Sequence, residues 1–132
     1  MKYFTIAELC RSNTADRLGI NNRCNQEHVS NLTALVDNVL DPLREAYGKP
    51  ITVNSGYRCP ALNKAVRGAA SSQHMTGQAA DIDTGDRQQN KLLFEYIRKA
   101  LPFDQLIDES NFAWVHVSFR ADGNNRNQVL KL

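Results

Sequence analysis

A long apolar stripe in the first third of the chain places the strongest constraint on the fold. Between Glu27 and Tyr47, aliphatic residues recur at spacings of three and four, which puts them on one face of a helix: Val29, Leu32, Leu35, Val36, Val39, Leu40 and Leu43. Gly48 and Pro50 end the pattern. Because Pro42 lies inside it and lacks a backbone N–H, we expect a kink, or a break between two helices, near Asp41.

Shorter patterns complete the expected elements. We predict helical segments after Thr5, which forms a capping box with Glu8, and over residues 60–66 and 87–99. The β-prone segments are 51–53, 79–83, 103–108, 114–119 and 129–132, most of them late in the chain. Since this order lacks a regular βαβα alternation, we predict an α+β fold with a small, mainly antiparallel sheet covered by helices on one side.

Length and charge exclude several classes of protein. The 132 residues fit one domain, residues 1–132. Lys and Arg number 16 against 14 Asp and Glu, and the basic residues are scattered among acidic ones, so no nucleic-acid partner is expected. No stretch approaches the roughly 20 apolar residues of a membrane span, so no membrane association is expected. We expect a monomer in solution.

The amino terminus and the cysteines bear on cellular location. Residues 1–6 lack the apolar core and cleavage site of a secretory signal, which predicts a chain that starts in the cytosol. Action on a cell wall would then need another route, such as phage-type release. The three cysteines, Cys10, Cys24 and Cys59, show no metal-ligand spacing, and their odd number leaves at least one thiol free in a monomer. We expect all three to be reduced.

Two segments carry candidate metal ligands. In a strand over residues 79–83, Asp81 and Asp83 share one face, and Gly77 allows the preceding loop to turn so that His74 lies beside Asp81. In residues 114–119, His116 shares a face with Trp114 and Ser118. Imidazole and carboxylate groups suit zinc, and three protein ligands plus a water is the pattern of a catalytic site.

These segments match the motifs of a known family. The sequence resembles the zinc D-Ala-D-Ala carboxypeptidases and the related phage L-alanyl-D-glutamate endolysins, which cut peptidoglycan peptides. The residues that carry the resemblance are Ser72, His74, Gly77, Ala79 and Asp81 in Ser-x-His-x-x-Gly-x-Ala-x-Asp, Trp114, His116 and Ser118 in Trp-x-His-x-Ser, and Ser55 to Arg58 followed by Leu62 and Asn63. The matching elements agree in order and separation over roughly residues 25 to 120.

The resemblance implies a Hedgehog/DD-peptidase fold, a Zn²⁺ cofactor held by His74, Asp81 and His116, and a peptidoglycan peptide as partner. It also assigns a substrate role to Arg58, whose planar guanidinium matches a terminal carboxylate in two parallel hydrogen bonds. Substrate-contacting candidates near the ligands are Ser72, Gln73, Trp114 and Ser118. For Arg58 the alternative is a surface salt bridge, and for Ser72 and Gln73 it is loop capping.

One position departs from the family pattern. Many members carry an Asp or Glu three residues before the last His ligand, where it serves as general base, and this chain has Ala113 there. The nearest acids in sequence are Asp108 and Glu109, and we favour Glu109 because a short hairpin could bring its longer side chain towards the metal. A solvated turn carboxylate is the alternative. Asp83 is a candidate for orienting a ligating histidine.

The sequence therefore predicts a zinc metallopeptidase that acts on peptidoglycan stem or cross-link peptides, with carboxypeptidase and endopeptidase activity left open. One alternative is a zinc-binding, non-hydrolytic peptide-recognition module, which Ala113 favours. A second is a structural metal domain, which would need a fourth ligand such as His28.

Overall fold

The computed structural model describes residues 1–132 and has the α+β architecture that the sequence predicts. Its helical elements, in chain order, are α1 (Ile6–Cys10), α2 (Asn13–Leu18), α3 (Gln26–Leu35), the π-helix η1 (Val36–Leu40), α4 (Asp41–Tyr47), α5 (Pro60–Ala65), the 3₁₀-helix η2 (Gln73–Thr76) and α6 (Arg87–Ala100). The strands are β1 (Thr52–Ser55), β2 (Ala79–Asp83), β3 (Gln105–Glu109), β4 (Trp114–Ser118) and β5 (Gln128–Lys131). No helix is both long and apolar enough to cross a membrane.

The five strands form one sheet in the order β1-β2-β4-β3-β5. Only the β3–β5 pair is parallel, which confirms a mainly antiparallel sheet. In the β2–β4 pair Asp81 lies directly opposite His116, and in the β3–β4 pair Glu109 lies opposite Trp114. The register therefore places the candidate ligands Asp81 and His116 side by side at the middle of β2 and β4, with Glu109 at the end of the neighbouring strand β3.

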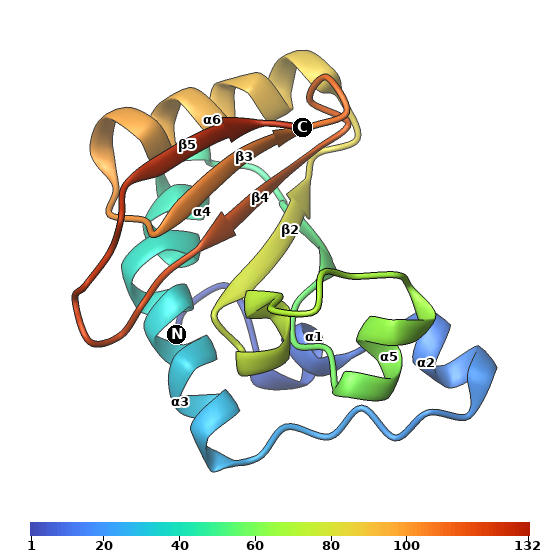
Figure 1. Cartoon of the computed structure of the whole chain (residues 1–132). Coiled ribbons are helices and arrows are strands. Elements are labelled where there is room, and N and C mark those ends of the chain that lie inside the picture. Colours follow the sequence, from blue (N-terminus) through green and yellow to red (C-terminus); the bar gives the residue numbers. More distant parts are fainter.

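Helices α3, α4 and α6 cover one face of the sheet, as Figure 1 shows, and the hydrophobic core lies between these layers. Fully buried strand residues that contribute to this core are Ile82, Leu106, Val115 and Val117, and the helices add Leu32, Leu35, Leu93 and Ile97. No helix crosses the opposite face of β3, β4 and β5 in Figure 1. Short helices α1, α2 and α5 gather at the end of the sheet where β2 begins.

The break expected near Asp41 takes the form of a π-helical segment. Helix α3 continues through η1 into α4, and the N–H of Asp41 donates to the carbonyl of Val36, five residues back. This wider turn comes immediately before Pro42, which cannot donate a hydrogen bond to the preceding turn. The long apolar stripe is thus kept on one side, and Leu32, Leu35, Val36, Val39, Leu40 and Leu43 are all buried.

The expectation of three reduced cysteines is wrong. Cys10, at the end of α1, forms a disulfide with Cys24, just before α3, and Cys59 is the free thiol. The chain reverses between them at Gly19, which caps α2 with φ of 68°. The spacing of 14 residues carries no local signal of pairing, because this contact depends on how α1, α2 and the following loop fold back on each other.

Candidate metal centre and its cleft

The uncovered face of the sheet forms the floor of a cavity of about 730 Å³. From β3, Gln105, Ile107 and Glu109 line it, and from β4, Trp114 and His116 do so. The period-two alternation of strands explains this, since the residues between them, such as Leu106 and Val115, point into the core. A second wall comes from the loop and helical turn over residues 66–74, including His74.

His74, Asp81 and His116 converge at one point of this cavity. One donor atom from each lies within 4.8 Å of the other two. Nε2 of His74 is 3.4 Å from Oδ1 of Asp81, and Nδ1 of His116 is 2.9 Å from the same oxygen. His74 is almost fully buried at 2% exposure, and Gly77, with φ of 78°, provides the turn between η2 and β2 that the sequence predicts.

The ring orientation of His74 is fixed by a hydrogen bond on the side away from Asp81. Its Nδ1 lies 2.7 Å from the carbonyl oxygen of Gly56, and a carbonyl can only accept a hydrogen bond. Nδ1 therefore carries the proton, and Nε2 presents a lone pair towards Asp81 and His116. Asp83, the residue considered for orienting a histidine, instead accepts hydrogen bonds from Gly85 and Asn90, so that assignment is wrong.

The donor set fits Zn²⁺. With bonds of about 2.0–2.2 Å, a tetrahedral zinc ion holds its ligand atoms roughly 3.3 Å apart, close to the distances found around Asp81. Burial opposes ionisation of Asp81, but its contacts with His116 and His74 outweigh this and hold the pKa of the carboxyl well below its usual range. The carboxylate is therefore ionised at neutral pH, as a metal ligand must be.

A carboxylate also lines the cavity beside the ligands. Glu109 ends β3 opposite Trp114, and both side chains face the cavity. Burial raises the pKa of Glu109, and the nearby charge of Asp81 raises it further. Asp108, the other acid considered, points away from the cavity, is 4% exposed and accepts a hydrogen bond from the N–H of Phe112. Of the two neighbours, only Glu109 can reach a substrate in the cavity.

Arg58 lines the same cavity at the end of the loop that follows β1. Its Nε is buried without a hydrogen-bond partner, and its one side-chain hydrogen bond runs from Nη2 to the hydroxyl of Ser72 at 3.4 Å. No carboxylate pairs with it, so the alternative of a surface salt bridge is wrong. Desolvation lowers the pKa of Arg58, but a guanidinium remains charged at neutral pH.

Comparison with known proteins identifies the family. The family model described as Peptidase M15 matches residues 2–118. The chain belongs to the Peptidase M15 family. It is also 42% identical over 76 residues to the zinc D-Ala-D-Ala carboxypeptidase of Streptomyces albus G. That match covers 50% of this chain and 30% of the relative, so the chain spans less than a third of that protein.

The remaining substrate-contact candidates differ in whether they line the cavity. Ser72, Gln73 and Trp114 line the cavity, although the Ser72 hydroxyl also caps η2 by accepting from the N–H of His74. Ser118 does not line it, since it is fully buried and its hydroxyl accepts a hydrogen bond from the N–H of Gln105. The assignment of Ser118 as a substrate contact is therefore wrong, and this hydroxyl joins the start of β3 to β4.

Ala113 and His28 both lie outside the metal centre. Ala113 ends the tight turn after β3 and lines a separate small hollow with Asp83 and Asn90, outside the metal cavity. His28 caps α3 together with Asn25 and stacks on Tyr57, with ring centroids 4.2 Å apart. It is not part of the His74–Asp81–His116 group, so a four-ligand structural metal site is wrong.

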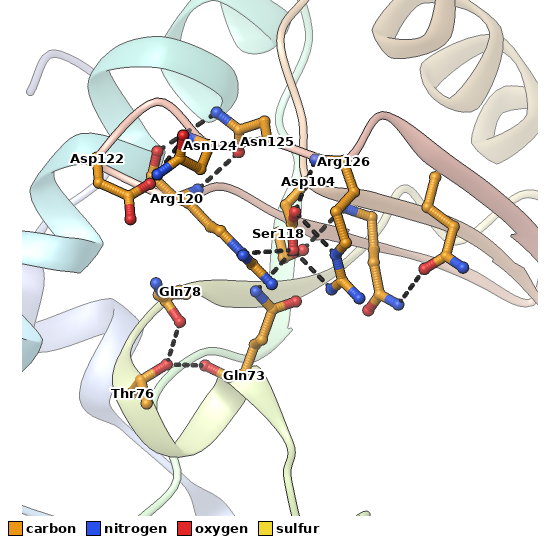
Figure 2. Close-up of polar contacts among 12 residues, drawn as sticks. Gln73, Thr76, Gln78, Asp104, Ser118, Arg120, Asp122, Asn124, Asn125 and Arg126 are labelled. Carbon is orange, nitrogen blue, oxygen red and sulfur yellow. Dashed lines mark hydrogen bonds and ion pairs between the residues drawn. The ribbon is translucent and has the colours of Figure 1, made fainter.

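Sequence reasoning missed two groups that hold residues of the cavity wall in place. Asn22 joins three backbone groups: its amide donates to the carbonyls of Cys10 and Tyr57 and accepts from the N–H of Cys59. These bonds fix both neighbours of Arg58. The second group is Asp104 with Arg120 and Arg126, shown in Figure 2. Neither has a local sequence signal, because each depends on contacts between distant segments.

Proposed function

We propose that this M15 peptidase is a zinc-dependent carboxypeptidase that removes the terminal residue from peptidoglycan stem peptides ending in D-Ala-D-Ala. The observation that carries the proposal is the convergence of His74, Asp81 and His116 in a cavity that also contains the unpaired guanidinium of Arg58. The similarity to the zinc D-Ala-D-Ala carboxypeptidase of Streptomyces albus G supports the choice of metal and substrate.

Each residue has a role that its environment supports. His74, Asp81 and His116 hold the metal, and the hydrogen bond from His74 to Gly56 keeps Nε2 directed at it. Bound zinc supplies Lewis acidity, which polarises a carbonyl and makes a water more acidic. Glu109 accepts the proton of the attacking water and returns it to the leaving amine, a role that a raised pKa favours.

Arg58 favours a carboxypeptidase over an endopeptidase. A guanidinium that is partly desolvated and has no carboxylate partner in the protein is energetically suited to bind one from a ligand. A terminal carboxylate provides the planar pair of oxygens that this group recognises. An internal peptide bond itself carries no such charge, so Arg58 favours a substrate that ends close to the cleaved bond.

The experiment is a digest of paired peptides by the zinc-loaded protein, with the products identified by mass. One peptide ends in D-Ala-D-Ala with a free carboxylate, and its partner ends in the carboxamide. We expect release of D-Ala from the first and at least tenfold slower turnover of the second. Arg58→Lys should abolish most of this preference, while Arg98→Lys, on the exposed face of α6, should retain it. Equal cleavage of both peptides, or cleavage only at internal bonds, would contradict the proposal.

A non-hydrolytic peptide-binding module is the second candidate, and Ala113 is the feature that favours it. The same digest distinguishes the two functions. A binding module would bind zinc and the free-carboxylate peptide but release no product under any condition, even with Glu109 present.

The disulfide supports a proposal about location. Cys10 and Cys24 are bonded, and such bonds persist in oxidising compartments but are rare in the reducing cytosol. We propose that the protein acts on the cell wall, outside the cytosol. Thiol labelling of the protein in intact cells, before and after reduction, should find one reactive cysteine in the working protein and three after reduction.

A further inference from the structure

Asp104 directly precedes β3, at the opposite end of this strand from Glu109, and is fully buried. Arg126 forms two hydrogen bonds with this carboxylate, from Nε to Oδ1 at 3.1 Å and from Nη2 to Oδ2 at 2.7 Å. Arg120 reaches the same carboxylate from the other side, with Nε 3.2 Å from Oδ2. Figure 2 shows the two guanidinium groups meeting at this one carboxylate, next to Gln73.

The charges of this group do not balance. Two guanidinium groups share a single carboxylate, and Gln73, which donates to Oδ2 of Asp104 at 2.9 Å, is neutral. Asp122 is the nearest other acid along the loop, but it is exposed and accepts from the N–H of Asn124 instead. One positive charge therefore remains without a partner in the protein.

The two arginines differ in how many of their side-chain N–H donors are used within the protein. Arg126 uses its backbone N–H as well as its side chain on Asp104, which fixes the loop ahead of β5. Arg120 uses only Nε, so both of its terminal nitrogens are without a hydrogen-bond partner, and its side chain is 35% exposed. Its backbone is held on both sides by Asn125, which accepts from the Arg120 N–H and donates to the Arg120 carbonyl. Arg120 is thus held in position with an open donor pair.

This open donor pair faces the same cavity as the metal centre. Arg120 and Arg126 line it together with Arg58 and Arg67, whereas the acids in the lining are Asp81 and Glu109. Gln73 connects the Asp104 group with the metal centre, because its side chain donates a hydrogen bond to Asp104 and it directly precedes the ligand His74 in the sequence. Since Arg58 serves one end of the cavity in the proposed function, the arginines at Asp104 are available for a different anionic group.

We propose that Arg120, supported by Arg126 and Asp104, forms a second carboxylate-binding subsite that selects peptides with an acidic residue upstream of the cleaved bond. This subsite rests on the proposed function, since it assumes a peptide whose terminal carboxylate is held by Arg58. Asp104 keeps the two guanidinium groups together despite their repulsion, and the carboxylate of the substrate takes the terminal nitrogens of Arg120. The substrate class is therefore a peptide with two carboxylates, one terminal and one on a side chain.

The experiment measures binding and turnover with a set of hexapeptides. Each is free of aromatic residues, ends in D-Ala-D-Ala, and carries a single Glu, or a Gln in its place, at one of the four upstream positions. Trp114 is the only tryptophan of the chain and lines the cavity, so its fluorescence reports binding. Dissociation constants are measured with the zinc-loaded Glu109→Gln protein, and kcat/KM is measured with Glu109 intact.

At one position we expect the Glu peptide to bind about tenfold more tightly than its Gln counterpart. Arg120→Gln should bring this ratio close to one, and Arg120→Lys should retain part of it, because Lys keeps the charge but lacks the planar fork. Arg98→Gln, which removes an exposed charge far from the cavity, should leave the ratio unchanged. A ratio is insensitive to a partly unfolded variant, since unfolded protein weakens the apparent binding of both peptides equally.

The subsite and the proposed function can fail separately. A parent protein that shows no Glu preference at any position, or a preference that survives Arg120→Gln, overturns the subsite even if every peptide is cleaved. If no peptide is cleaved but the Glu preference is present and depends on Arg120, the subsite holds and the hydrolytic function fails.

Discussion

The ring of His74 is oriented by the backbone of Gly56, whose carbonyl oxygen lies 2.7 Å from Nδ1. This carbonyl is held in turn by the contact of its loop with α1, because the N–H of Tyr57 donates to the carbonyl of Leu9 at 2.8 Å. There is no space for a side chain at Gly56, since a Cβ there would lie 2.2 Å from the Leu9 oxygen. The orientation of a metal ligand therefore depends on a close approach between two backbone segments.

Gly56→Ala should weaken zinc binding. The added methyl group must push the loop away from Leu9, which moves the carbonyl that fixes His74, and loss of such a partner lowers metal affinity by about 10–100-fold. Competition with a chelator measures the zinc dissociation constant. Gly19→Ala is the control, because it strains a left-handed residue remote from the metal site and should lower thermal stability without changing zinc affinity. Equal zinc affinity of the Gly56→Ala protein and the unaltered protein would show that this carbonyl does not orient the ligand.

Glu109→Gln should lower kcat by about 10²–10⁴-fold while zinc affinity stays within a factor of a few, because the change removes a proton acceptor and no metal ligand. Ala113→Asp should not rescue the Glu109→Gln protein, since residue 113 lines the hollow beside Asn90 and not the metal cavity. Steady-state kinetics on both single variants and the double variant give the comparison. Recovery of turnover in the double variant would mean that the turn after β3 can bring residue 113 to the substrate.

Asp104→Asn should change how stability depends on pH. Burial alone would raise the pKa of Asp104, but hydrogen bonds from Arg126 and Gln73 outweigh it and hold the pKa well below its usual range. A carboxyl whose pKa is depressed on folding stabilises the protein above its unfolded pKa of about 3.9, and this contribution is lost as pH falls through the folded value.

The difference in melting temperature between the unaltered protein and Asp104→Asn should therefore be largest above about pH 5 and shrink in stronger acid. Thermal melts of the metal-free proteins across this range provide the measurement. Asp122→Asn, at an exposed carboxylate of the same loop, should show no comparable pH dependence. A constant difference between the Asp104 proteins at all pH values would argue against an ionised, paired Asp104 in the folded state.

Removal of the disulfide should lower stability. Cys10 and Cys24 close a loop with a separation of 14 residues, and a cross-link of this size contributes about 3 kcal/mol by restricting the unfolded chain. The Cys10→Ser/Cys24→Ser protein should unfold at a correspondingly lower urea concentration. Cys59→Ser leaves the cross-link intact and is the control. If the double variant keeps its stability but loses turnover, the disulfide acts on the Arg58 loop through Asn22 and not on the fold as a whole.

Local patterns accounted for most of the fold. The apolar stripe, the Thr5 cap and the alternating strands each depend on residues close together in sequence, and each element formed near its predicted bounds. The strand expected over residues 103–108 begins instead at Gln105, because the N–H of Asp104 bonds to the carbonyl of Ser118 and its side chain to Arg126. The exact form of the break at Pro42 also had no local signal.

The candidate site was predictable where motifs carried it. The family motifs that contain His74, Asp81 and His116 implied three ligands, and the antiparallel register of β2 and β4 brought two of them directly opposite each other. Face alternation alone could not distinguish Trp114 from Ser118, which share one side of β4 but differ because Ser118 is covered by the start of β3. Arg120 and Asn22 were missed, since their importance comes from partners up to 37 residues away.

Strand β3 has one further consequence for substrate choice. From the buried carboxylate of Asp104, which directly precedes the strand, to the half-buried Glu109 at its end, the chain advances five residues in an extended conformation that rises about 3.3 Å per residue. The two ends are thus separated by roughly 16 Å, about the length of five residues of an extended peptide. A rigid strand of this length would select substrates by the number of residues between the recognised side chain and the bond that is cut. A peptide with the right charges at the wrong interval would therefore be a poor substrate.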